Sequence, residues 1–265
     1  MLKRAALALL LVGASLHAQE AVVLPGFEVA TVKPAKGGGH ENWNVDSNWT
    51  RIENAKMVDL IRDSYGLGTD AQVVDGPDWL RTERFDVAAK VGEAEYARES
   101  KLTGKAGEEA YQGLMQSFLK ERFGLVVVRE TRKEPIHALL LQGTAASTAL
   151  RPTALGPDGT PLHGRHSMGR MGSFECSGVT MEDLAGMLSN KFELEQLWVH
   201  DETGLKGYYD FSRKYAPDRG KGVAADATDP GLVDALREQL GLRVKKQVGD
   251  VPVVVVKELR RPDFD

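Results

Sequence analysis

Short stretches of alternating apolar and polar residues are interspersed along the chain with segments of helical periodicity. Residues 27–34 alternate in this way and stop at Pro34, which predicts a strand. Met57, Leu60 and Ile61 recur at helical spacing, and the glycines at 66 and 68 suit a helix end. The same reasoning predicts further helices at 110–122, after Thr180 and at 231–240, and further strands at 51–54, 72–74, 84–90, 125–131, 135–141, 172–176, 197–199, 208–215, 242–247 and 251–259.

These elements predict an α+β fold. Segments 125–131 and 135–141 are expected to form one hairpin, and 242–247 and 251–259 another, turning at Gly249-Asp250. Each half of the chain then has the order β-α-β-β-α-β-β, with helices packed on largely antiparallel sheets.

The two halves share an internal repeat. Met57-Val58-Asp59-Leu60 recurs as Met181-Glu182-Asp183-Leu184, and Phe85-Asp86-Val87 recurs as Tyr209-Asp210-Phe211, both 124 residues later. We therefore expect two homologous halves, 19–142 and 162–265, joined by the aperiodic linker 143–161. A second set of residues recurs at a separation of 117: Leu119, Glu121, Gly124, Leu125 and Pro135 match Leu236, Glu238, Gly241, Leu242 and Pro252.

The first 18 residues have the pattern of a secretory signal peptide. Lys3 and Arg4 precede an apolar run that is too short to span a bilayer, and Ala18 suits cleavage. We expect an extracytoplasmic protein, in the periplasm or secreted, with no stable membrane insertion after cleavage. Removing Lys3 and Arg4 changes the net charge from −4 to −6, which gives no electrostatic reason to bind nucleic acid. The single cysteine, Cys176, excludes an internal disulfide.

Acidic residues are the first candidates for chemistry. Paired carboxylates such as Asp75 with Asp86, or Asp201 with Asp210, could support hydrolysis of a glycan. Because such acids recur in both halves, often at turns, structural roles are the preferred interpretation, and no catalytic residue is predicted. His163, His166, His200 and Cys176 lack the spacing of a zinc site, so no metal or cofactor is predicted.

The segment 42–49 is the speculative ligand site. Trp43 and Trp49 lie among Asn42 and Asn44, and aromatic faces beside amide groups suit a sugar or a peptide. The alternative is a loop whose tryptophans pack on the sheet. Segments that the halves do not share are the places to look for function, chiefly 43–49, the charged insertion 93–108 and 163–166.

Several motifs in order resemble a known family. They are residues 27–34, Gly76-Pro77-Asp78-Trp79-Leu80, 119–125, 201–211 and 239–242. This set resembles a soil-associated, secreted family of uncharacterised function that is abundant in acidobacteria. The resemblance implies export and a domain of unknown function. Related domains are sometimes attached to membrane zinc peptidases of the antibiotic-sensor type, but this chain has no His-Glu-x-x-His motif.

The sequence thus favours a non-enzymatic module of the cell envelope or exterior that binds a ligand or a protein. Its partner would be an unknown envelope protein or a glycan or peptide ligand. The alternatives are a hydrolase of cell-wall or environmental polymers, and a sensor or regulatory module that works with an envelope peptidase.

Overall fold

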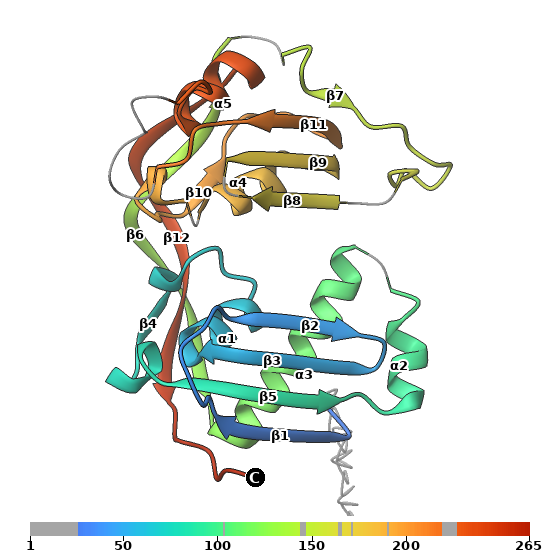
Figure 1. Ribbon diagram of the computed structural model, residues 1–265, viewed down its shortest axis with the longest axis vertical. Coiled ribbons are helices and arrows are strands. Elements are labelled where there is room, and N and C mark those ends of the chain that lie inside the picture. The colour runs from blue at the N-terminus through green and yellow to red at the C-terminus, as the bar shows by residue number, and fades with distance from the viewer. Residues whose placement is uncertain are drawn as a thin grey trace, which may run out of the picture.

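A computed structural model describes residues 26–102, 104–143, 147–163, 166–170, 172–189, 191–218 and 227–265. They form two lobes that are connected by a long two-stranded ribbon (Figure 1). The described part has a mixed α and β fold with five α-helices and three mostly antiparallel sheets. The predicted signal peptide lies outside the described residues.

Lobe 1 is an antiparallel sheet with helices on one face (Figure 1). Phe85 and Phe123 meet edge to face in its core, with ring centroids 5.4 Å apart. The strand order is β1 (Val29–Pro34), β5 (Arg84–Lys90), β3 (Trp49–Lys56), β2 (Asn42–Asp46), and the helices are α1 (Met57–Ser64), α2 (Glu93–Glu99) and α3 (Lys105–Phe123).

Lobe 2 has a second antiparallel sheet with its own core. Phe174 stacks on Tyr215 with centroids 5.1 Å apart, and Leu184 and Leu236 bring the two helices of this lobe into the same cluster. The strand order is β7 (Arg151–Pro152), β11 (Tyr209–Lys214), β9 (Ser173–Val179), β8 (His166–Arg170), and the helices are α4 (Met181–Ser189) and α5 (Leu232–Leu240). The predicted linker 143–161 contains β7.

The ribbon consists of β6 (Val126–Leu141) and β12 (Leu242–Glu258), which pair with each other antiparallel. At the lobe 1 end, β4 (Val73–Asp75) adds to β12 in parallel. At the lobe 2 end, β10 (Val199–Asp201) adds to β6 in parallel. The ribbon therefore contributes to both cores.

The predicted hairpins at 125–141 and 242–259 are wrong. The structure has one continuous strand in place of each, and each strand pairs with the other half of the chain. Pro135 and Pro252 are tolerated because each lies two residues before the third strand begins to pair, at His137 and Val254. The residues that suggested turns instead form the part of the ribbon between the lobes.

The predicted helix ends are confirmed. α3 and α5 stop at Gly124 and Gly241, whose φ angles of 59° and 65° are in the left-handed region that glycine adopts most easily. The predicted cap of α4 is also present, since the Thr180 backbone N–H donates to Asp183 Oδ2 at 2.7 Å. The charged insertion 93–108 is not a simple loop: it holds α2 and the first turn of α3.

Candidate ligand-binding groove between the lobes

A groove runs between the two lobes. It is made of two adjoining recesses, of about 890 and 780 Å³, that share Gly66, Glu108, Glu182 and Asp183. Lobe 1 contributes the end of α1 and the first half of α3, and lobe 2 contributes the start of α4, with β10 alongside. Because both lobes line it, the shape of the groove depends on how the ribbon places them.

Arg62 and Asp63 form much of the lobe 1 wall. The Arg62 guanidinium bridges two carboxylates through Nη1, Asp59 Oδ1 at 3.1 Å and Asp70 Oδ1 at 2.5 Å. Asp63 is exposed at the surface of a recess. Protein atoms around the carboxylate displace part of its water, which raises its pKa, and the positive charge of Arg62 partly offsets this effect. Arg62 is thus committed to structural ion pairs, whereas no hydrogen bond is seen at the Asp63 carboxylate within the described part of the chain.

Trp198 and the start of α4 form the lobe 2 wall. The Trp198 ring is half-buried, and its centroid lies 5.1 Å from that of the exposed His200. Gly68 of lobe 1 approaches this ring so closely that a Cβ there would lie 3.0 Å from Trp198 Cδ1. The lobes therefore meet at the ribbon end of the groove.

The groove is acidic. Six acids and four permanent cations line the two recesses, and Lys105 is already 3.8 Å from Glu109. The acids are Asp63, Glu108, Glu109, Glu182, Asp183 and Asp201, and the cations are Arg62, Lys105, Arg129 and Lys206. Ligands that carry positive charge match this balance better than anions do.

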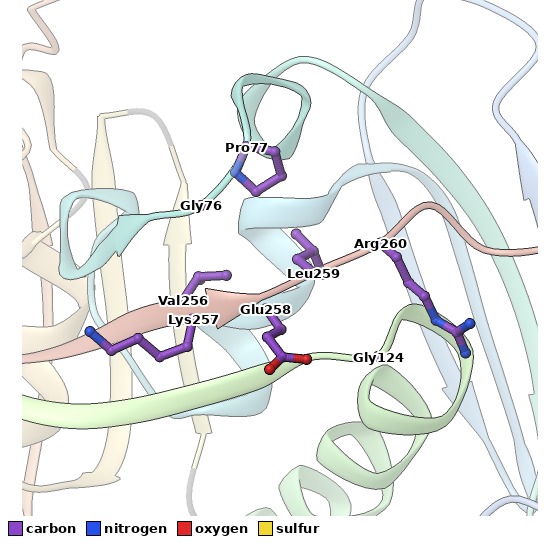
Figure 2. Close-up of a pocket in the computed structure, with 8 residues that line it drawn as sticks. All are labelled: Gly76, Pro77, Gly124, Val256, Lys257, Glu258, Leu259 and Arg260. Carbon is purple, nitrogen blue, oxygen red and sulfur yellow. The ribbon is translucent and has the colours of Figure 1, made fainter.

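A second hollow, of about 820 Å³, lies on lobe 1 alone, between Gly76-Pro77, Gly124 and the end of β12 (Figure 2). Figure 2 shows Lys257 and Arg260 extending in opposite directions, with Glu258 between them. A Cβ at Gly124 would lie 3.0 Å from Arg260 Nε, so this arginine packs on the end of α3. Polar groups do not converge here, which favours the groove between the lobes as the ligand site.

The predicted site residues all lie on the β2–β3 hairpin, but not on one face. Trp49 is 39% exposed beside Arg51, and the register places Asn42 and Asn44 on this same face. Trp43 points to the opposite face and packs against the lobe 1 core, as the alternative interpretation of this segment proposed. The structure thus brings three of the four residues together and separates Trp43 from them.

The repeated acids Asp86 and Asp210 support the backbone before a helix. Asp86 Oδ1 accepts a hydrogen bond from the Asn54 N–H, and Asp210 Oδ1 accepts one from the Gly178 N–H, both at 2.8 Å. Asp201 accepts from the Thr203 N–H at 2.9 Å, as expected for a turn residue. These contacts agree with the structural roles that their repetition predicts.

Asp201 and His200, which were considered from the sequence for hydrolysis and for zinc, line the groove, but most of the other groove residues could not be identified from the sequence. One of the three unshared segments, 93–108, does supply Lys105 and Glu108. In the described part of the chain, no three His, Cys, Asp or Glu side chains are grouped so that they could hold a metal ion. His163 is exposed, whereas the side chain of His166 lies outside what the structure describes.

These features define a two-lobed α+β protein with an acidic groove between its lobes. The chain belongs to the family described as a protein of unknown function (DUF3738), whose model matches residues 58–259. The match includes both groove walls. No curated protein and no solved structure matches the chain. Of the helices described, none has the length and apolar character needed to cross a membrane.

Proposed function

We propose that this chain is an exported, non-enzymatic module that binds a ligand, or a segment of a partner protein, in the groove between its lobes. The observation that carries the proposal is that α1 and α3 of one lobe face α4 and β10 of the other across two adjoining acidic recesses. A ligand held there contacts both lobes at once, and it gains the area that neither lobe offers alone. The envelope or the cell exterior is the proposed location.

We prefer binding to catalysis because Asp210, one of the acids considered for hydrolysis, is engaged in structural hydrogen bonds. Asp210 accepts three hydrogen bonds through one oxygen, from Gly178, Thr153 and Ser177. A carboxylate held in this way keeps its charge and supports the fold, whereas a general acid needs a raised pKa and access to substrate. The geometry thus supports a recognition role more than hydrolysis.

We also infer that the two halves arose by duplication. Asn54 and Gly178, 124 residues apart, both have positive φ angles, 57° and 62°, and both donate to the matching Asp of their lobe. The strand orders β1-β5-β3-β2 and β7-β11-β9-β8 also match element by element. On this interpretation the groove lies between two equivalent surfaces that have since diverged.

A thermal-shift panel tests the binding proposal. The melting temperature of residues 19–265 would be measured in the presence of basic and acidic peptides, glycans, peptidoglycan fragments, and metals with and without a chelator. A ligand at about 100 times its Kd should stabilise by about 2.7 kcal/mol, or roughly 5–10 °C for a chain of this size. If no compound in the panel changes the melting temperature, the groove is not the ligand site we propose.

The groove is located by a matched pair of variants. Glu182→Lys reverses a charge in the groove, and Glu258→Lys makes the same change in the lobe 1 hollow, at another exposed position. We expect the first to abolish the shift given by a basic ligand and the second to leave it intact. Equal behaviour of the two variants would contradict the proposed site.

A further inference from the structure

Two open sheet edges face the space between the lobes. β2 is the terminal strand of the lobe 1 sheet and β8 is that of the lobe 2 sheet. Figure 1 shows these two strands as the ones nearest the gap, one on each side of it. Within the described residues β2 pairs only with β3, and β8 only with β9. An edge strand leaves every second residue with an unpaired backbone N–H and C=O.

The outer edges of the same sheets are blocked. The Val32 N–H on β1 donates to Asp265 Oδ2 at 2.9 Å, and the Asp265 N–H donates back to the Val32 carbonyl at 3.3 Å. β7, the outer strand of lobe 2, is two residues long and contains Pro152. A covering segment, a short strand and a proline are devices that protect an edge from pairing with another chain.

β2 carries none of these devices. Its residues Asn42–Asp46 include no proline, glycine or lysine, and Val45 is 58% exposed. The last pair in the register is Asp46↔Trp49, so the hairpin closes with a two-residue turn. In such a hairpin the residues on either side of the turn, Asp46 and Trp49, form both backbone N–H to C=O hydrogen bonds with each other. The alternation then directs the N–H and C=O of Trp43 and Val45 away from β3, toward the open edge.

The open edge adjoins the acidic groove. Glu41, which immediately precedes β2, accepts a hydrogen bond from Trp43 Nε1 at 2.9 Å. Arg62, which lines the groove, is close enough to interact electrostatically with the same carboxylate. A chain paired with β2 would therefore pass the Glu41 carboxylate at the edge of the groove.

We propose that an extended, basic segment of a partner protein pairs with β2 as an added strand. This inference rests on the proposed binding function and names its ligand class. The backbone ladder would supply affinity, and the groove acids would select lysine or arginine at alternate positions. The requirement is for a peptide with free backbone N–H groups, which a glycan or a small amine lacks.

The test uses an acetylated hexapeptide of alternating lysine and valine, measured by fluorescence anisotropy on residues 19–265. We expect saturable binding, and weakening of about tenfold or more when alternate backbone nitrogens are N-methylated, because ladder bonds are lost. A peptide of alternating glutamate and valine should bind at least about tenfold more weakly than the lysine peptide. Neither comparison depends on folding of a variant.

A pair of variants locates the edge. Val45→Pro removes an outward N–H without removing a bond to β3, whereas Val45→Ala shortens the side chain and keeps the N–H. We expect the proline variant to lose about tenfold in affinity and the alanine variant to stay within about twofold of the parent chain. Equal melting temperatures of the two variants would show that the fold is intact.

Four outcomes would overturn pairing of β2 with a partner segment. If N-methylation and Val45→Pro have no effect while Glu182→Lys abolishes binding, the groove binds but no strand is added. If glycans bind and the peptides do not, strand addition fails and the groove proposal stands. If Val45→Pro instead dissolves a dimer seen by light scattering, the occupant of the edge is a second copy of this chain. If no ligand of any class binds, both proposals fail.

Discussion

Asp210 stabilises the start of α4 through a single carboxylate oxygen. That oxygen accepts hydrogen bonds from the Gly178 N–H at 2.8 Å, the Thr153 hydroxyl at 2.7 Å and the Ser177 hydroxyl at 3.2 Å. Burial opposes the charge, but these three bonds, together with Arg151, hold the pKa of Asp210 below its usual value. The carboxylate is therefore worth most to the fold when it is ionised.

This arrangement makes the stability of lobe 2 pH-dependent. The unfolded carboxyl has a pKa near 3.9, so the stabilisation is fully present above about pH 4 and is lost as the pH falls through the lower folded value. We expect Asp210→Ala to lower the free energy of unfolding by about 1–3 kcal/mol at pH 7, since it leaves the Gly178 N–H unpaired. Urea unfolding at pH 7 and near pH 3 measures both effects.

Asp86→Ala is the matched control. Asp86 accepts one hydrogen bond, from Asn54, in the described part of the chain, so Asp86→Ala should lower the unfolding free energy less than Asp210→Ala does. If Asp210→Ala destabilises the chain as much near pH 3 as at pH 7, the ionised carboxylate is not the source of the stability.

Single residues also show what the sequence could reveal. The recurrence of Asp86 and Asp210 in the sequence predicted structural roles for both, and each accepts a hydrogen bond from a backbone N–H. Apart from Asp183, which matches Asp59 in the sequence, the groove acids gave no such signal: Asp63, Glu108 and Glu182 belong to three different helices. Their proximity depends on how the lobes are placed, which no local pattern encodes.

At the scale of elements, helix ends were predictable and strand partners were not. Gly124 and Gly241 end their helices for a local reason, a positive φ angle. Gly249 resembles a turn glycine in sequence, but it has no positive φ angle and lies within β12. A Cβ there would be 2.4 Å from Ile136 Cδ1, so this glycine makes room for a side chain on the paired strand.

A double-mutant cycle tests that role of Gly249. Gly249→Ala should lower the free energy of unfolding by about 1–3 kcal/mol through overpacking, and Ile136→Val by about 1 kcal/mol. The double variant should lose about 1 kcal/mol less unfolding free energy than the two single losses added together, because valine lacks the clashing Cδ1. Additive losses in urea unfolding would show that Ile136 is not the obstacle.

At the scale of the molecule, the ribbon joins two cores that share strands. Leu242 at the start of β12 is buried in the lobe 2 core, and Val254 and Val256 near its end are buried in the lobe 1 core. The lobes are thus coupled through β12, although each has its own sheet and helices. The two lobes also touch directly where Gly68 meets Trp198, at the ribbon end of the groove.

Alanine variants of two glycines that line the groove can distinguish the effect of lobe placement on binding from an effect on local stability. A Cβ at Gly68 would lie 3.0 Å from Trp198 Cδ1, whereas a Cβ at Gly186, within α4, meets nothing within 4 Å. We expect Gly186→Ala to stabilise the chain by about 0.5–1 kcal/mol, as alanine does in a helix, and to change ligand-induced thermal shifts less than Gly68→Ala does. Gly68→Ala should instead displace the Trp198 ring and weaken those shifts, with a change in tryptophan emission that Gly186→Ala does not produce. If both variants keep the full ligand response, the Gly68–Trp198 contact does not control the groove, and the ribbon alone determines how the lobes are held.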